Sequence, residues 1–181
     1  DLGEASVQIA SDSYSIGELA TRRLIDDGCS RILCLRNNSR MRMPANKRTD
    51  AYHDVVEQAG LPALVREVEF VKSDDEKSAV VAKILDENPD IDGIFAGDDT
   101  MAAICLNVMK QRGLSAPDDI KVVGADGARR TMTFMPDLTT VRQDIDRIGE
   151  LAAQSIIALI NGDKPESNIK LPVELIEGKT A

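Results

Sequence analysis

The middle of the chain holds two apolar runs, each of which ends at a carboxylate. Ile91–Ala96 is soon followed by two acidic residues, Asp98 and Asp99. A helical pattern and a second apolar run come next, and that run ends in Asp126-Gly127. A strand, a helix and a strand in this order form the repeating unit of a parallel sheet. Ligands bind beyond the carboxyl ends of such strands, so we expect Asp98 and Asp126 to face one cleft.

The same alternation covers nearly the whole chain. The expected strands are residues 7–10, 32–35, 65–71, 91–96, 120–125, 138–141 and 169–176. The expected helices are residues 15–28, 46–59, 74–88, 99–112 and 145–160. This order predicts an α/β fold, with a parallel sheet covered by helices on both faces as an α/β/α sandwich.

Composition narrows the class of protein. The chain has 181 residues and a net charge of −9. That length suffices for a domain with a real core, but the negative charge argues against nucleic-acid binding by this chain. No apolar run approaches the roughly 20 residues of a membrane span, and no secretory signal is visible. We therefore expect a cytoplasmic protein without membrane contact and, because it begins with Asp1, a fragment.

The residues that carry catalysis in common enzyme motifs are missing. Cys29, Cys34 and Cys105 are an odd count of cysteines, two of them in apolar segments, so we expect buried free thiols. No Cys-x-x-Cys pair, phosphate-binding glycine loop, G-x-S-x-G turn or H-E-x-x-H helix occurs. His53 is the only histidine. We expect no catalytic residue, no metal and no cofactor, and hence a protein that is not an enzyme.

Four segments together carry a family resemblance. They read FAGDDTMA, GLSAPDDIKVVGADG, PDLTTVRQD and LPVELIEGKT, in this order. In sequence and spacing they resemble the effector-binding half of lactose-repressor/galactose-repressor (LacI/GalR) transcription regulators, from about Val7 to the C-terminus. The resemblance implies a periplasmic-binding-protein-like fold, in which two α/β subdomains face each other across a cleft and the chain crosses between them three times.

The resemblance implies that the two subdomains are unequally represented in this chain. Residues 31–142 and 169–181 correspond to a complete C-terminal effector-binding subdomain. Residues 1–30 and 143–168 correspond to a truncated N-terminal subdomain. The helix-turn-helix that reads DNA in the family is absent from this sequence and is expected upstream of it.

The truncation has an expected physical consequence. The three crossings should lie around Asp27–Arg31, Arg142–Asp144 and Asn168–Pro172. The helices at 15–28 and 145–161 would then have lost the sheet on which they pack. We expect their apolar stripes to be exposed and the chain to be less stable than the full regulator, or to hide those faces in an assembly.

Three residues near strand ends are candidate ligand contacts. By resemblance, Asp98 and Asp126 match cleft positions, and Gln143, at a crossing, offers both a donor and an acceptor. Each also has a simpler explanation. Asp98 or Asp99 can cap a helix, Asp126-Gly127 can form a turn, and Gln143 can satisfy backbone groups at a hinge.

Two arginines come from the only basic cluster. Arg48, in NKRTDAY, matches a family arginine that starts a helix and reaches into the cleft. Arg42 matches a second ligand-contacting position in some members. A guanidinium suits bidentate contacts to hydroxyls or phosphate. The rest of the cluster, Arg36, Arg40 and Lys47, is expected to be a solvated loop.

Asp12 and Asp74 complete the expected site. By resemblance, Asp12 matches a cleft carboxylate of the opposite subdomain, and Asp74 matches a position that is often aromatic in sugar-binding members. Helix capping by Asp74 or Ser73 is the simpler alternative for the second position. The chain has no Trp and only two Tyr and three Phe, so aromatic surface for a sugar is scarce.

One helix is apolar nearly all round and is a candidate dimer face. Residues 101–109 read MAAICLNVM, so this helix is either fully buried or packed between its own sheet and a partner subunit. By resemblance, this helix, the helix near Asp74 and the loop at 131–135 form the dimer interface. The candidates are Met101, Cys105, Phe134 and Met135.

The resemblance implies a sensor of small molecules. A sugar or sugar phosphate would bind between the subdomains, and a homodimer would reach operator DNA only through a domain missing from this chain. A periplasmic sugar-binding protein of a transport system is the main alternative. An α/β enzyme is a weaker alternative, because no nucleophile–base pair or nucleotide loop is present.

Overall fold

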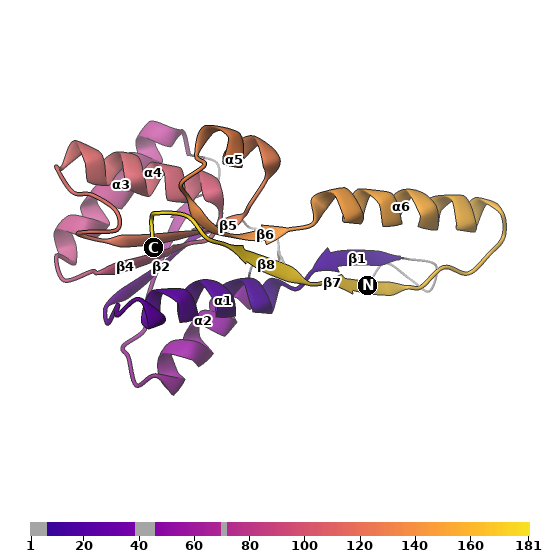
Figure 1. Ribbon diagram of the computed structural model, residues 1–181, viewed down its shortest axis with the longest axis horizontal. Helices are drawn as coiled ribbons and strands as arrows, with labels where there is room; N and C mark the ends of the chain where they lie inside the picture. The colour runs from indigo at the N-terminus through magenta and orange to yellow at the C-terminus, as the bar shows by residue number, and fades with distance from the viewer. Residues whose placement is uncertain (1–6, 39–45, 70–71) are drawn as a thin grey trace.

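The computed structural model describes residues 7–38, 46–69 and 72–181. It shows a wide body built on one sheet and a narrow arm that projects from it (Figure 1). The body's sheet has six strands in the order β3-β2-β4-β5-β6-β8. These are Leu64–Glu69, Ile32–Asn38, Gly93–Ala96, Lys121–Asp126, Thr139–Gln143 and Val173–Ile176. All neighbours are parallel except β6 and β8. The predicted α/β fold with a mainly parallel sheet is confirmed.

Helices cover both faces of this sheet (Figure 1). One face carries α1 (Ser13–Asp26) and α2 (Asn46–Gln58), and the other carries α3 (Asp74–Glu87) and α4 (Asp99–Gln111). The central strands are apolar throughout because both of their faces are buried. In β4, for example, every residue is buried. None of the described helices is both long and apolar enough to cross a membrane.

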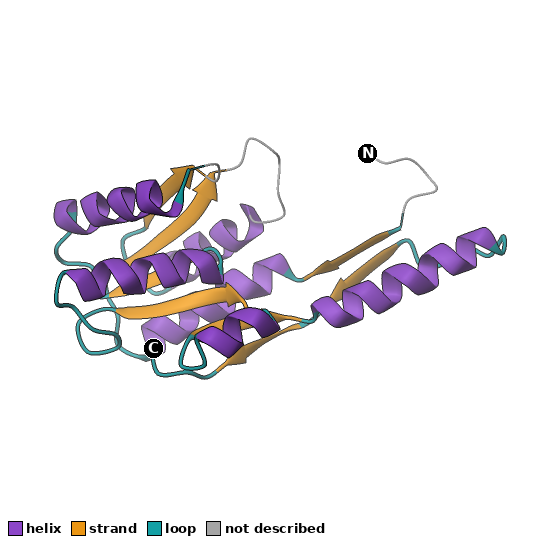
Figure 2. Ribbon diagram, turned by 90° about the horizontal axis from the view of Figure 1, so that it is seen from above, coloured by secondary structure: helices purple, strands orange, loops and turns teal. Residues whose placement is uncertain are grey.

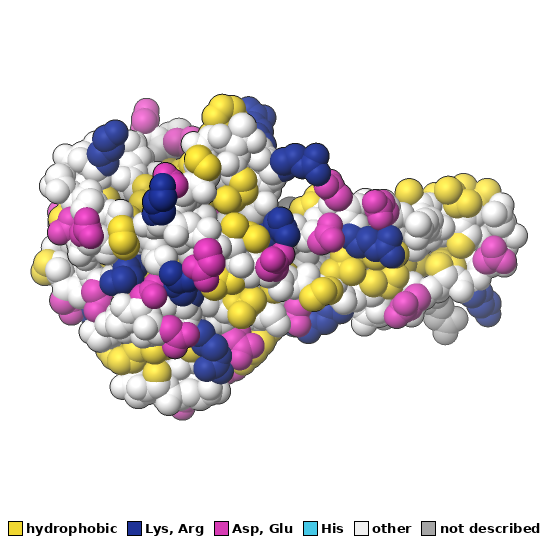
Figure 3. All heavy atoms as spheres, viewed as in Figure 1, with side chains coloured by type: hydrophobic (Ala, Val, Ile, Leu, Met, Phe, Trp, Pro, Cys, Tyr) yellow, Lys and Arg dark blue, Asp and Glu magenta, His cyan; other side chains and the backbone are white. Residues whose placement is uncertain are grey.

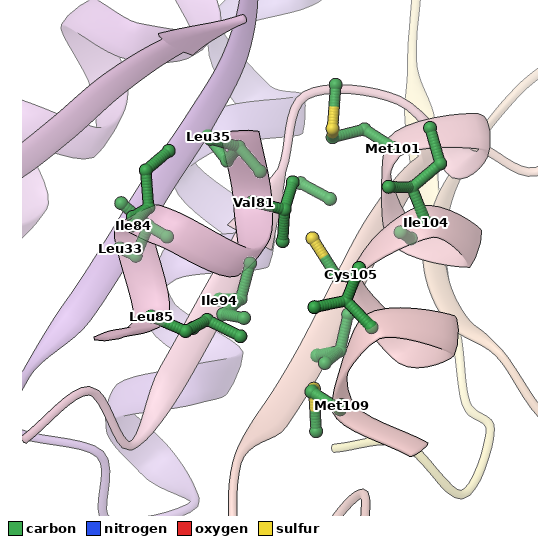
Figure 4. Packing of buried hydrophobic residues seen from close by; sticks show 14 of the residues in the cluster. Leu33, Leu35, Val81, Ile84, Leu85, Ile94, Met101, Ile104, Cys105 and Met109 are labelled. Carbon is green, nitrogen blue, oxygen red and sulfur yellow. The ribbon is translucent and has the colours of Figure 1, made fainter. Parts of the chain in front are cut away.

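The core between α3, α4 and the sheet contains two residues that the sequence analysis assigned to a dimer interface. Met101 is 1 % exposed and Cys105 is fully buried, and both pack against α3 and the strands (Figure 4). The chain's own α3 covers these two side chains, so neither offers surface to a partner, and the alternative of a fully buried helix fits both. Burying a methionine side chain such as Met101 stabilises the fold by roughly 1.5–3 kcal/mol. All three cysteines are buried free thiols, as predicted.

The opposite core corrects the expectation for the first helix. Ile16, Ala20 and Leu24 of α1 are fully buried, in one cluster with residues of α2 and the strands. The apolar stripe of this helix is therefore not exposed. The chain first passes between arm and body at Asp12, where β1 leads into α1, rather than around residues 27–31. The first helix thus packs with the subdomain that was expected to be complete.

The arm consists of two strands and one long helix (Figures 1 and 2). Strands β1 (Gln8–Ser11) and β7 (Asn168–Leu171) form a separate parallel pair. Helix α6 (Ile145–Ile160) lies beside them. The single strand expected at residues 169–176 is two strands in two sheets. They separate at Pro172, which has no N–H to donate to a ladder.

Helix α6 bears out the expected exposure. Ser155 is its only buried residue, whereas Ile160 is 78 % exposed. Other large apolar side chains of α6 are exposed as well, namely Ile145, Ile156, Ile157 and Leu159. Hydrophobic side chains gather along the arm in Figure 3. The described residues therefore leave the arm without the cover that such a helix needs.

One short helix replaces an expected loop. Helix α5 spans Arg129–Phe134, where a loop was predicted for residues 131–135. Phe134 is 76 % exposed, and Met135 is partly buried against the core that contains α3 and α4. Of the four predicted interface residues, Phe134 is the one that presents a large apolar surface to solvent.

Candidate functional site

Three of the predicted site residues meet at the carboxyl end of the sheet. Arg48 lies in the first turn of α2, Asp126 ends β5, and Gln143 ends β6. The Arg48 Nη2 and Asp126 Oδ1 atoms are 2.9 Å apart. Gln143 Nε2 donates to the same oxygen at 2.6 Å. Arg48 Nη1 also donates to the carbonyl of Gly97, at the end of β4. The side chains thus join the ends of three neighbouring strands, as the strand-end rule predicts.

A close approach of two helices places Arg48. A Cβ at Gly17 of α1 would lie only 2.1 Å from the carbonyl oxygen of Arg48. Glycine therefore allows α2 to cross α1 at this point. Further along α2, the hydroxyl of Tyr52 donates to the Ile32 carbonyl at 2.7 Å and accepts from the Leu64 N–H at 2.8 Å. The close approach at Gly17 and the hydrogen bonds of Tyr52 together fix α2, and with it Arg48, against the rest of the body.

Asp98 combines the two roles considered for it. Its Oδ1 accepts the N–H of Met101 at 2.8 Å and caps α4. Its Oδ2 accepts a hydrogen bond from the side-chain amide of Asn37. Burial raises the pKa of Asp126 and the charge of Asp98 contributes to this rise, so Asp98 belongs to the same group of side chains as Arg48 and Asp126.

Asn37 is a member of this group that the sequence analysis missed. It lies near the end of β2, and its Oδ1 is buried without a hydrogen bond to the described residues. Arg48 Nε is likewise buried without a hydrogen bond to the described residues. The group therefore holds, among the described residues, one acceptor and one donor without a hydrogen bond, and each can bond a hydroxyl. The signal was present, because Asn37 follows the apolar run 32–35 as Asp98 follows the run at 91–96. Residues from 36 onwards had instead been assigned to a loop.

Asp126 is held in a strained and charged setting. Its φ is 109°, a left-handed backbone that non-glycine residues rarely adopt. Burial raises the pKa of the Asp126 carboxyl above its ordinary value, although the Arg48 cation opposes this. Arg48 thus supplies a counter-charge that favours the ionised form of a partly desolvated carboxylate. The alternative for Asp126 was a simple Asp-Gly turn. The Asp126 side chain also bonds Arg48 and Gln143, which a turn alone does not require.

Asp99 does not cap the helix and does not line the group. It is only 3 % exposed. Its Oδ2 accepts the N–H of Gly127 at 2.8 Å, and its Oδ1 accepts the hydroxyl of Thr140 at 2.6 Å. Burial, with a contribution from the Asp126 charge, raises the pKa of Asp99 to about 6.

Asp12 forms its contacts with α1 and β7, and with none of Arg48, Asp98 and Asp126 among the described residues. It caps α1 by accepting the N–H groups of Tyr14 and Ser15, both at 3.2 Å. It also pairs with Lys170 of β7 at 2.6 Å. Burial works against the charged carboxylate, but these hydrogen bonds outweigh it and lower the pKa of Asp12. Asp12 thus stands where arm and body join.

Asp74 and Arg42 are the remaining predicted residues. Ser73, rather than Asp74, caps α3, in a reciprocal capping box with Glu76. The Asp74 side chain is 76 % exposed and lies 3.9 Å from Lys77. Its described contact is therefore within α3. Arg42 lies outside the described residues.

A groove adjoins the group where body and arm meet. Its volume is about 750 Å³, and it is lined by residues of α5, β6, α6 and β8 with the turns beside them. Gln143 and Gly127 are among the lining residues. Gln143 therefore touches Asp126 and also borders the junction through which the chain enters α6.

Comparison with known proteins agrees with this architecture. Residues 21–181 match the periplasmic binding protein-like domain family. The chain is 32% identical over 174 residues to a ribose operon repressor of Halalkalibacterium halodurans, which covers 95% of this chain and 51% of that protein. It is 32% identical over 170 residues to a sucrose operon repressor of Lactococcus lactis, which covers 94% of this chain and 52% of that one. The chain therefore spans about half the length of these curated relatives.

The fold is also similar to that of solved transcriptional regulators. A CelR transcriptional regulator in complex with cellobiose superposes with a TM-score of 0.84 at 27% identity, over 99% of this chain and 55% of that one. Together with the match over residues 21–181, this similarity shows that the chain belongs to the periplasmic binding protein-like domain family and that it is similar over nearly its whole length to part of LacI-type regulators.

Proposed function

We propose that this chain is the effector-binding part of a bacterial transcription regulator that responds to a sugar. The observation that carries the proposal is the convergence of Arg48, Asp98, Asp126 and Gln143 at one end of the sheet. Each of these side chains can bond a hydroxyl. Relatives named as ribose and sucrose operon repressors support a sugar as the ligand class. They also favour a regulator over a periplasmic transport protein.

The charge of the group favours a neutral sugar over a sugar phosphate. Among the described residues of the group, two carboxylates, Asp98 and Asp126, face one guanidinium, Arg48. A phosphate would approach this excess of negative charge at a cost. A neutral polyhydroxyl compound would instead donate to the carboxylates and accept from Arg48 Nε.

The proposed response passes through Gln143. This residue bonds Asp126 at 2.6 Å and lies directly before the crossing to α6. A ligand that bonds Asp126 would alter the Gln143–Asp126 contact, and would thereby change the free energy of one orientation of arm and body relative to another. It can shift that equilibrium only by its difference in affinity for the two states. In the intact regulator, a homodimer working in the cytoplasm would pass the change to a DNA-binding domain outside this sequence.

The test compares Asp126→Ala with a matched control, Asp163→Ala, whose side chain is exposed in the turn after α6. Binding of D-ribose, sucrose and cellobiose is measured by isothermal titration calorimetry with the intact regulator. A sugar that binds the wild type should bind the control equally and lose at least about tenfold in affinity with Asp126→Ala, since a charged hydrogen bond is lost. Operator binding without sugar should be unchanged. An effector midpoint that Asp126→Ala leaves in place would reject the assignment.

A further inference from the structure

Asp99 is the one buried carboxylate among the described residues that the proposed site does not use. Both of its oxygens are engaged at short distance. One accepts the backbone N–H of Gly127, directly after Asp126, and the other accepts the hydroxyl of Thr140 on β6. Asp99 is also the first residue of α4, directly after Asp98. It therefore ties the start of α4 to the ends of two strands.

The segment that Asp99 holds is the strained one. Asp126 has a φ of 109°, and Gly127 follows with a φ of 57°. Asp126 keeps this left-handed backbone only where its surroundings hold it, whereas Gly127 adopts its own without strain. Hydrogen bonds hold this pair from two sides. Arg48 and Gln143 hold the Asp126 side chain, and Asp99 holds the next backbone N–H.

The space around Asp99 is fitted to the carboxylate. A Cβ at Gly124 of β5 would lie 2.6 Å from Asp99 Oδ1. Only glycine therefore lets the carboxylate lie against β5. A Cβ at Gly127 would lie 2.7 Å from the Cα of Arg142, so the turn is also pressed against β6. Both the Asp99 carboxylate and the turn at Gly127 are therefore closely packed against neighbouring strands.

We propose that Asp99 is a positioning residue. By holding the Gly127 N–H and the Thr140 hydroxyl, it fixes the backbone of Asp126 and so directs the Asp126 carboxylate towards Arg48 and the ligand. This inference rests on the proposed function, because it is the sugar contact of Asp126 that Asp99 would serve. Asp99 itself touches no ligand. Thr140 lies on the same strand as Gln143, so the same contact also helps to place Gln143, one of the two partners of Asp126.

The first readout needs no ligand. Hydrogen exchange of the Gly127 amide is measured by NMR in the wild type and in Asp99→Ala, Asp99→Asn and Thr140→Val. Asp99→Ala should lose Gly127 protection by about tenfold or more, since its acceptor is gone. Asp99→Asn keeps an acceptor oxygen for Gly127 and should stay within about threefold of the wild type. Wild-type protection in a folded Asp99→Ala protein would overturn the proposal. If that variant does not fold, Thr140→Val decides, and unchanged Gly127 exchange in it counts against the proposal.

The second readout is sugar affinity in the intact regulator, with D-ribose, sucrose and cellobiose as probes. Asp99→Ala should weaken the sugar that binds by about tenfold, which corresponds to about 1.4 kcal/mol, and Asp99→Asn should restore most of it. Rescue by asparagine separates positioning from a need for the charge. Loss of Gly127 protection with full affinity would overturn the link to the ligand. If Asp126→Ala also keeps full affinity, the proposed function fails instead, and the exchange data alone decide what Asp99 does to the turn.

Discussion

Replacing Asp99 with asparagine should stabilise the protein at neutral pH and change it little in acid. The Asp99 carboxyl is almost fully buried, and burial raises its pKa to about 6 from an ordinary 3.8. Below pH 3.8 the group is protonated in both the folded and the unfolded chain, and its contribution to stability is fully present. As the pH rises towards 6, the unfolded chain ionises first, so that contribution is lost. Above pH 6 both states are ionised and no further change follows.

The size of the effect follows from the two pKa values. A gap of roughly two pH units corresponds to about 3 kcal/mol, at about 1.36 kcal/mol for each unit. Asparagine does not titrate, and it can still accept the Gly127 N–H. The unfolded carboxyl is already about half ionised at pH 4, so the free energy of unfolding of Asp99→Asn relative to wild type should rise by about 2.4 kcal/mol between pH 4 and pH 7.5. This is a large fraction of the stability of an ordinary domain.

Urea denaturation followed by far-UV circular dichroism measures this difference at half-unit steps of pH. The matched control is Asp118→Asn, which changes an exposed carboxylate in a loop. The control should show a difference from wild type that varies by less than about 0.5 kcal/mol over the range, as surface changes usually do. A difference between Asp99→Asn and wild type that is constant from pH 4 to pH 7.5 would show that Asp99 is not desolvated in the folded chain. The argument from burial would then be refuted.

Three further changes test other parts of the structure. Gly127→Ala should lower the free energy of unfolding in urea by about 1–3 kcal/mol, because its Cβ would lie 2.7 Å from the Cα of Arg142; an unchanged midpoint would contradict the close packing. Ile160→Lys should reduce binding of a hydrophobic dye and self-association in light scattering, since Ile160 is 78 % exposed; a wild-type chain that is monomeric, unfolds cooperatively and binds no dye would show that the arm is already covered. Phe134→Ser should leave stability within about 0.5 kcal/mol but shift the intact regulator towards monomer in analytical ultracentrifugation, and an unchanged dimer would remove Phe134 from the interface.

The sequence predicted the elements of the fold well because periodicity reports burial directly. Strands buried on both faces read as continuous apolar runs, as at Gly93–Ala96, and the helices read as stripes. It predicted less well what covers each stripe. In sequence, the apolar stripe of α1 and the apolar surface of α4 cannot be distinguished from surfaces that pack on a missing sheet or on a partner subunit. Only packing shows that α2 covers the first and α3 covers the second.

The candidate site was predicted in part, for a related reason. Asp98, Asp126 and Gln143 stand at strand ends, and strand ends can be found from sequence. Asn37 was missed because β2 continues beyond its apolar run to Asn38. The different tasks of Asp98 and Asp99 could not be told apart, since adjacent residues point in different directions only once the helix is docked.

The order of apolar runs, helical stripes and polar strand ends was therefore enough to determine an α/β sheet with polar groups gathered at one edge. Local chemistry dictates such features, because each depends on a few neighbouring residues. Contacts between distant segments were decided only by the folded chain. They include the pairing of Arg48 with Asp126, the hold of Asp99 on Gly127, and the change of sheet at Pro172. These contacts depend on the distance between two backbone segments, which cannot be inferred from the sequence of either segment alone.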